Sequence, residues 1–193
     1  MADFMTDYLA ESTAAMQAFA ADQACHAAMR AMADAICTSL RAGGKLMIAG
    51  NGGSAGDAQH IAGEFVARMM YDRAPLAAIA LTTDTSVLTA TANDYGYDHI
   101  FERQVRALGR PGDLFLGIST SGKSKNILAA MDAGRAQGVE SLAFCGPGTE
   151  ALEPRCKAIL AVPSSRTPVI QQLHIVAAHI VCTLVEAEMF PKM

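Results

Sequence analysis

A chain of 193 residues is long enough for one α/β domain with additional helices, and its 51% apolar and 18% charged residues predict a folded core. The net charge of −4 excludes a broad basic surface for nucleic acid, although a few loop donors can still hold a small phosphorylated ligand. Five cysteines without C-x-x-C spacing are typical of reduced thiols, so we expect a cytoplasmic protein.

Neither a secretory signal nor a membrane segment is expected. The first turns carry Asp3, Asp7 and Glu11, and no basic segment is followed by an apolar run. The longest strongly apolar stretch, residues 175–185, is interrupted by His179 and is expected to be too short to span a bilayer.

The chain begins with a helical pattern. Apolar residues recur at helical spacing through the first forty-odd residues, which predicts two helices separated near residues 22–24. Gly43 and Gly44 then end the second helix. We expect a single domain over residues 1–193, with residues 1–42 as an N-terminal helical extension and residues 43–193 as the α/β core.

Short apolar runs alternate with helical segments in the rest of the chain. The expected strands are residues 45–49, 76–81, 114–118, 139–144 and 159–162. A helix follows the first strand as far as about Met70, and the last helix covers residues 168–189. This alternation predicts a parallel sheet covered by helices on both faces.

A loop rich in hydroxyls follows the third expected strand. Ser119, Thr120, Ser121 and Ser124 lie there, just before a helix. Hydroxyls and free N–H groups at a helix start can hold an anion such as phosphate. One serine alone would be only a helix cap, but four hydroxyls in six residues favour phosphate binding.

A glycine-rich loop follows the first expected strand. Asn51, Gly52 and Gly53 lie between that strand and its helix, where glycine permits a positive φ and the close approach of a ligand. Glycine is common at such junctions for geometric reasons, so this loop alone is a weak signal. Two loops after different strands could nevertheless face one cleft.

Two helices carry candidate acid–base or metal-binding groups. His60 and Glu64 share a helix face, a spacing that suits a metal or a base beside an imidazole but is also common in surface contacts. On the last helix, His179 has apolar neighbours and is expected to be buried. Ideal helical geometry places Gln172 on the face of His179, with Gln171 about 80° away.

Together these motifs resemble the sugar isomerase (SIS) domain family and, within it, the phosphoheptose isomerases, over nearly the whole chain. The segments that carry the resemblance are residues 49–54, residues 57–60 with Glu64, residues 93–96, residues 119–122 with Ser124, and residues 170–171 with His174 and His179.

The resemblance implies a five-stranded parallel sheet flanked by helices. It also implies a homotetramer with the N-terminal helices in the interface and sites between subunits. The implied sugar contacts are Asn51, Gly52, Gly53, Glu64, Asn93, Asp94 and Gln171, and the implied phosphate contacts are Ser119, Thr120, Ser121 and Ser124. One zinc ion per subunit would be held by His60, Glu64, Gln171 and His179. Here Gln171 replaces Gln172, since the first turn of a helix need not follow ideal geometry.

The implied activity is the conversion of sedoheptulose 7-phosphate to D-glycero-D-manno-heptose 7-phosphate. This is the first step towards nucleotide-activated heptose for lipopolysaccharide or related glycans. Glu64 is the expected base and His179 its acid–base partner, with the order of action open. Both a catalytic and a structural role for zinc are compatible with the sequence.

Three other functions are considered. The first is an isomerase for a different sugar phosphate. The second is a non-catalytic SIS regulator that binds a protein such as the replication initiator, and the presence of Glu64 and His179 argues against it. The third is a sugar-phosphate-sensing domain of a transcription factor, but the sequence has no helix-turn-helix or basic extension.

Overall fold

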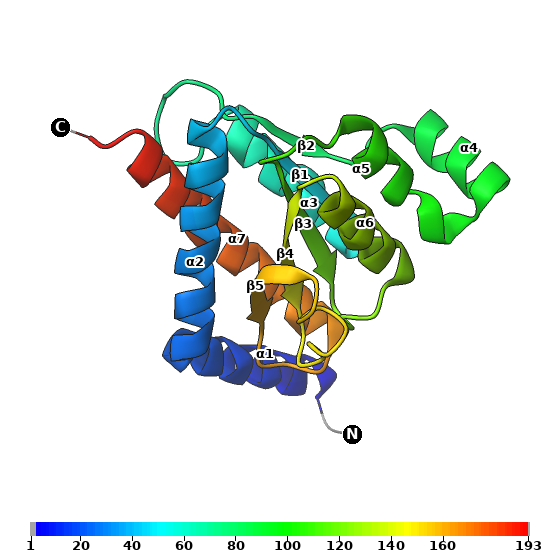
Figure 1. Ribbon diagram of the computed structural model, residues 1–193. Helices are drawn as coiled ribbons and strands as arrows, with labels where there is room; N and C mark the ends of the chain where they lie inside the picture. The colour runs from blue at the N-terminus through cyan, green and yellow to red at the C-terminus, as the bar shows by residue number, and fades with distance from the viewer. Residues whose placement is uncertain (1–2, 193) are drawn as a thin grey trace.

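The computed structural model describes residues 3–192 as helices alternating with strands around one sheet (Figure 1). In chain order the elements are α1 (Phe4–Ala21), α2 (Gln23–Arg41), β1 (Leu46–Gly50), α3 (Gly53–Val66), β2 (Ala78–Ala80), α4 (Thr85–Tyr95), the 3₁₀ turn η1 (Tyr97–His99), α5 (Glu102–Leu108), β3 (Leu114–Ser119), α6 (Lys125–Ala136), β4 (Glu140–Cys145), β5 (Cys156–Ala161) and α7 (Thr167–Met189).

All five strands run parallel, in the order β2-β1-β3-β4-β5. The central strands β1 and β3 are buried along their whole length, which explains why each is a continuous apolar run. They pair in register from Leu46 with Leu114 to Gly50 with Ile118, so the loops that follow them emerge side by side. The predicted parallel sheet is confirmed.

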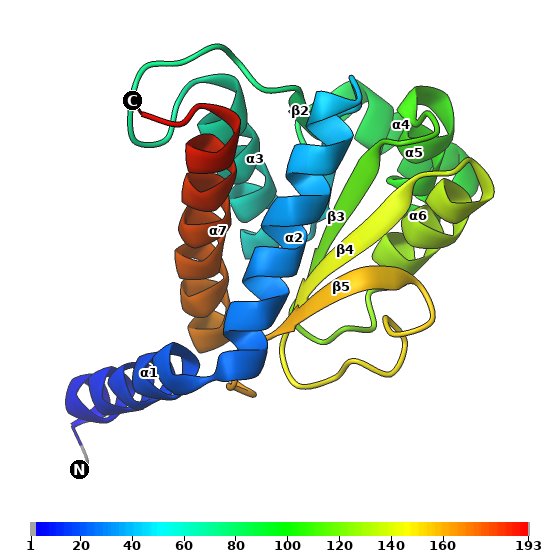
Figure 2. The same ribbon diagram turned by 60° about the vertical axis from the view of Figure 1, so that its left-hand side comes forward.

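Helices cover both faces of the sheet (Figure 2). Alternate strand residues point to opposite faces. Ile48 and Leu116 belong to the core shared with α2, α3 and α7. Met47 and Phe115 belong to a second core on the side of α5 and α6. The arrangement is the three-layer α/β fold expected from the sequence.

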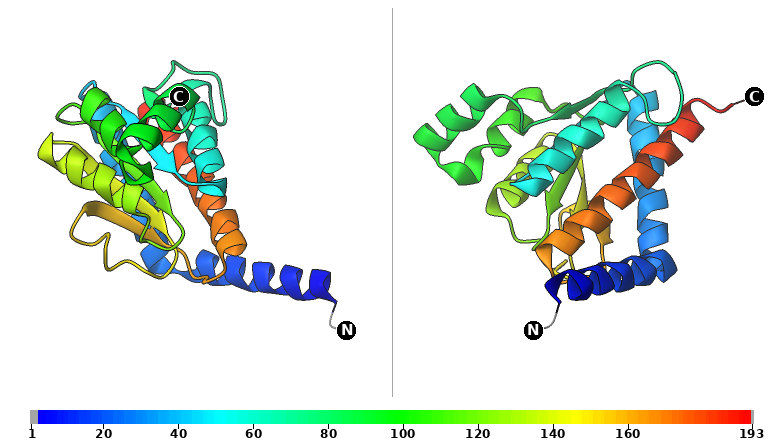
Figure 3. Two further views of the ribbon diagram at one scale, coloured as in Figure 1. Left: turned by 90° about the vertical axis from the view of Figure 1, so that its right-hand side faces the viewer. Right: turned by 180° about the vertical axis from the view of Figure 1, so that it is seen from behind.

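The two N-terminal helices are confirmed, and they pack differently. Asp22 separates them, because its side chain caps α2 by accepting from the backbone N–H groups of Ala24 and Cys25. Helix α2 buries an apolar stripe against α7 and the sheet. Helix α1 projects from the body (Figure 3), and its large apolar residues Phe4, Met5 and Leu9 are exposed.

Three predicted boundaries were wrong. Helix α3 ends at Val66 rather than near Met70, because the guanidinium of Arg73 takes the carbonyls of Glu64 and Phe65 that another helical turn would use. Strand β2 has three residues instead of six, since it forms the edge of the sheet and pairs only with β1. Strand β5 begins at Cys156, three residues before the predicted start, where the charged Lys157 interrupts the apolar pattern.

The expectation that no apolar segment could span a membrane needs correction. Helix α7 has 23 residues and is long and apolar enough to do so by length and composition alone. Half of its most apolar window is buried in the fold, where it packs on α2 and α3. We therefore interpret α7 as a core helix of the domain.

Candidate functional site

The two polar loops predicted from the sequence lie together at one edge of the sheet. The strand order reverses between β1 and β3, and in open α/β sheets ligands bind outside the carboxyl ends of the strands at such a point. The glycine-rich loop follows β1 and the serine loop follows β3, so the structure brings both to this place.

The glycine-rich loop lets α3 and α7 approach closely. Gly52 has a φ of 57°, in the region that favours glycine. Gly53 begins α3, and a Cβ atom there would lie 2.5 Å from Nε2 of Gln171. The loop therefore places the Gln171 amide of α7 directly against the start of α3.

The serine loop is organised by its own hydroxyls. Oγ of Ser119 lies 2.8 Å from Oγ of Ser124 and also accepts from the backbone N–H of Ser124. Ser119 is only 3% exposed, so its hydroxyl holds Ser124 in place, whereas Thr120, Ser121 and Ser124 are accessible. Ser124 is the N-cap of α6 without a side-chain cap bond, which leaves N–H groups at the helix start available to an anion.

Helices α3 and α7 bring together three further candidate residues. Nε2 of His60 lies 3.0 Å from Nε2 of His179 and 3.2 Å from Oε1 of Glu64. One donor atom from each residue falls within 4.8 Å of the other two. The three side chains therefore form one cluster between the two helices.

Two of the three donor separations in this cluster suit a tetrahedral metal. Ligand atoms of a zinc site with bonds of about 2.0–2.1 Å lie about 3.3 Å apart, close to the 3.0 Å and 3.2 Å observed. Two imidazoles and a carboxylate are ligands that zinc commonly takes. The amide of Gln171 on α7 lies against Gly53 at the start of α3, so it lies between the same two helices as the cluster.

One expectation about α7 was wrong. His179 is half-buried, and the fully buried histidine is His174, whose Nε2 lies 3.2 Å from the carbonyl oxygen of Cys145. Gln172, which ideal helical geometry favoured, is exposed and donates to Oη of Tyr8 in α1.

Asn93 and Asp94 lie at the exposed end of α4. Nδ2 of Asn93 donates to Oδ1 of Asp94 at 2.8 Å. Within residues 3–192, neither side chain makes a hydrogen bond to another candidate residue. The segment still reaches the site, since Oη of Tyr97, directly after α4, donates to Oδ1 of Asn51 at 3.0 Å.

Asp57 lies in a segment that carries the resemblance, but no role was assigned to it from the sequence. Its spacing to Gly53, His60 and Glu64 puts all four on one face of α3, which was a usable signal. Its Oδ2 is buried without a hydrogen-bond partner, and burial raises the pKa of this carboxyl, although His60 opposes the shift.

Arg73 and Glu186 fix α3 to α7 below the cluster. Nε of Arg73 donates to Oε1 of Glu186 at 3.1 Å, and its other nitrogens donate to the carbonyls of Glu64 and Phe65. Both charged side chains are buried. The pair ties the end of the helix that carries His60 and Glu64 to the helix that carries His179.

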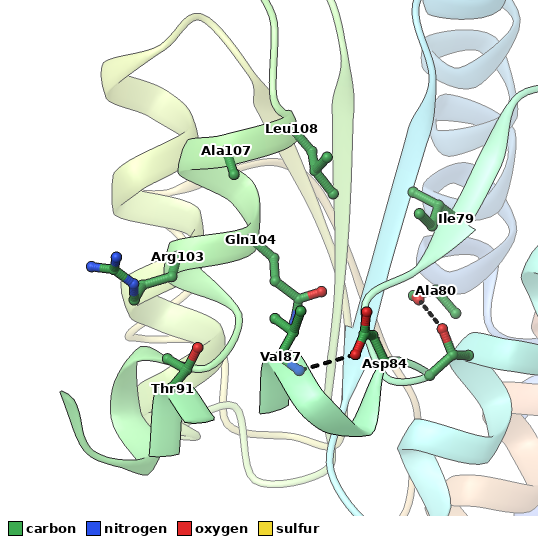
Figure 4. A pocket seen from close by; sticks show the side chains of 10 residues that line it. Ile79, Ala80, Asp84, Val87, Thr91, Arg103, Gln104, Ala107 and Leu108 are labelled. Carbon is green, nitrogen blue, oxygen red and sulfur yellow. Dashed lines mark hydrogen bonds between the residues drawn. The ribbon is translucent and has the colours of Figure 1, made fainter. Parts of the chain in front are cut away.

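A cavity of about 410 Å³ lies elsewhere, between the edge strand β2 and helices α4 and α5 (Figure 4). Its walls include Ile79, Val87 and Leu108, with Gln104 and Asp84 as polar groups. It shares no residue with the loops or the helix cluster. We place the candidate site at the loops and the cluster, where the reactive side chains converge.

Comparison with known proteins identifies the family of the chain. The sequence model of the SIS domain matches residues 7–146. A phosphoheptose isomerase of Burkholderia pseudomallei is 52% identical over 189 residues, covering 98% of this chain and 96% of that protein.

Two solved structures are similar over the whole fold. A phosphoheptose isomerase from Neisseria gonorrhoeae has a TM-score of 0.87 at 40% identity, covering 95% of this chain and 97% of that one. Another from Francisella tularensis has a TM-score of 0.88 at 34% identity, covering 94% and 95%. The chain therefore belongs to the phosphoheptose isomerase family of SIS-domain proteins.

Proposed function

We propose that this chain is an aldose–ketose isomerase that converts sedoheptulose 7-phosphate to D-glycero-D-manno-heptose 7-phosphate. The observation that carries the proposal is the cluster of Glu64 with His60 and His179, on the helices beside two loops suited to a sugar phosphate. The name shared by relatives at about half identity supports the reaction and the substrate. The product would enter the synthesis of nucleotide-activated heptose.

The proposed chemistry moves a proton between two neighbouring carbons of the sugar. Glu64 removes the proton from C1 of the ketose, which gives an enediol, and returns it to C2 to form the aldose. His179 moves the proton between the oxygens on C1 and C2. A carboxylate and an imidazole from different helices can reach the two carbons and their oxygens at the same time.

The loops would bind the rest of the substrate. Thr120, Ser121 and Ser124 offer hydroxyls to the phosphate together with the free N–H groups of α6, while Ser119 holds Ser124. The sugar would be contacted by Asn51, Gly52, Gly53, Glu64, Asn93, Asp94 and Gln171.

We further propose one zinc ion per subunit, held by His60, Glu64, Gln171 and His179. The spacing of the three clustered donors supports this, and Gln171 adjoins them through Gly53. A carboxylate held by a metal is a weaker base, so the ion would serve either as a Lewis acid on a substrate oxygen or as a structural link between α3 and α7.

A cytoplasmic homotetramer with sites between subunits is the proposed assembly. The exposed residues Phe4, Met5 and Leu9 on the projecting helix α1 support this, because an apolar helix face is stabilised when another subunit covers it. The free cysteines fit a reducing compartment. Sedimentation equilibrium should give four times the chain mass, and a fully active monomer would contradict the assembly.

The experiment that tests the function is an isomerisation assay on ketose phosphates of five, six and seven carbons. Preferred turnover of sedoheptulose 7-phosphate supports the proposal. Preference for a shorter substrate would make the chain a different sugar-phosphate isomerase. Absence of turnover with all of them would favour a non-catalytic SIS regulator.

A further inference from the structure

Asn126, which the sequence analysis did not single out, lies between the two loops of the candidate site. It is the second residue of α6 and is 3% exposed. Its Nδ2 donates to Oδ1 of Asn51 at 2.8 Å, and Nδ2 of Asn51 donates back to Oδ1 of Asn126 at 3.0 Å. This reciprocal pair joins the serine loop to the glycine-rich loop across β1 and β3.

The pair decides what Asn51 can offer to a ligand. A side-chain amide has two N–H donors and an oxygen that accepts two bonds. Oδ1 of Asn51 already accepts from both Asn126 and Tyr97, so it is saturated. One of the two N–H groups of Asn51 is used by Asn126, and the other has no hydrogen-bond partner within residues 3–192.

We propose that Asn126 is a positioning residue, which holds the Asn51 amide so that its free N–H donates to an oxygen of the bound sugar. Tyr97 completes the arrangement from η1 by occupying the second acceptor site of Asn51. The inference rests on the proposed function, because the orientation of Asn51 matters for turnover only if a sugar phosphate binds beside it.

The substitution Asn126→Asp tests this orientation with almost no change in shape. The new carboxylate can accept from Nδ2 of Asn51 but cannot donate to Oδ1 of Asn51, so two oxygens face each other and the Asn51 amide is no longer held in one orientation. We expect kcat/KM for sedoheptulose 7-phosphate to fall about 10- to 100-fold at neutral pH, the size of effect that a misplaced contact produces.

The pH profile separates positioning from a structural role. A protonated carboxyl regains an O–H donor, so the activity of Asn126→Asp relative to the unsubstituted enzyme should rise as the pH falls from about 8 to about 5. Burial raises the pKa of the new carboxyl from its ordinary value of about 3.9, while its place in the first turn of α6 opposes this shift. Asn126→Ala removes both bonds and should lose activity without recovery at low pH.

Inorganic phosphate serves as a probe of the serine loop, and Arg135→Ala is the control. Arg135 is exposed in the last turn of α6, at the opposite end of the helix from the serine loop, so its substitution should leave kcat/KM unchanged. Inhibition by inorganic phosphate should persist in Asn126→Asp. Loss of that inhibition would mean that the loop itself collapses, and unchanged kcat/KM in both Asn126 variants would also overturn the proposal. If the unsubstituted enzyme were inactive, the proposed function would fail instead.

Discussion

The buried imidazole of His174 should make the stability of the fold fall in mild acid. The side chain is 1% exposed, packs against Phe144, and has a buried Nδ1 without a partner. Burial lowers the pKa of His174 to about 4, from 6.5, although the bond to Cys145 opposes the shift. In mild acid the unfolded chain therefore binds a proton at His174 that the folded chain does not bind.

The sign and size of the effect follow from these two pKa values. Between about pH 6.5 and about pH 4 the unfolded state holds more protons, so stability is fully present above pH 6.5 and is lost as the pH falls. At about 1.4 kcal/mol for each pH unit between the two values, the total loss is about 3 kcal/mol, of which about 2 kcal/mol is lost by pH 5.

Urea unfolding of the unsubstituted protein and of His174→Leu, at one protein concentration and several pH values, measures this loss. The variant removes the titrating group, and the carbonyl of Cys145 keeps its backbone bond from Val162. The difference in unfolding free energy between the two proteins should change by about 2 kcal/mol between pH 7 and pH 5. A constant difference would refute the assignment of a buried neutral histidine.

Three further variants test the Arg73–Glu186 pair, the serine loop and the metal site. Arg73→Ala leaves Glu186 buried without its charged partner, although the backbone N–H groups of Met69 and Met70 still donate to it. The unfolding free energy should fall by about 3–5 kcal/mol, and a loss under about 1 kcal/mol would contradict the buried pair. Ser121→Ala combined with Ser124→Ala should raise KM about 10-fold or more, because phosphate contacts serve ground and transition states alike. Unchanged KM would place the phosphate elsewhere. His60→Ala should lower the zinc content of protein purified without chelator, and an unchanged content would move the metal site.

The layered α/β fold could be predicted because its signal is local. Strands buried on both faces are continuous apolar runs, and the loops after β1 and β3 carry their polar residues in sequence. The end of α3 could not be predicted in this way. Arg73, seven residues beyond the last helical residue Val66, takes the carbonyls at that end, and no periodicity encodes such a contact.

Some residues of the site could likewise be predicted from the sequence, and others could not. His60 and Glu64 were identifiable from helical spacing on one helix. The buried histidine of α7 was misassigned because apolar neighbours surround both His174 and His179 in the sequence. Only contacts in the fold distinguish them, since His174 packs against Phe144 and His179 faces His60. Asn126 was missed, since one asparagine in the first turn of a helix is unremarkable until the fold places it against Asn51.

The most direct test of the central claim compares the unsubstituted chain with Glu64→Gln in converting sedoheptulose 7-phosphate to the aldoheptose phosphate. Glutamine keeps the size of the side chain but cannot accept the proton from carbon. The unsubstituted chain should turn over, and Glu64→Gln should be slower by about 10²–10⁴-fold while still binding the sugar phosphate. Equal turnover by the two proteins would contradict the assignment of Glu64 as the base.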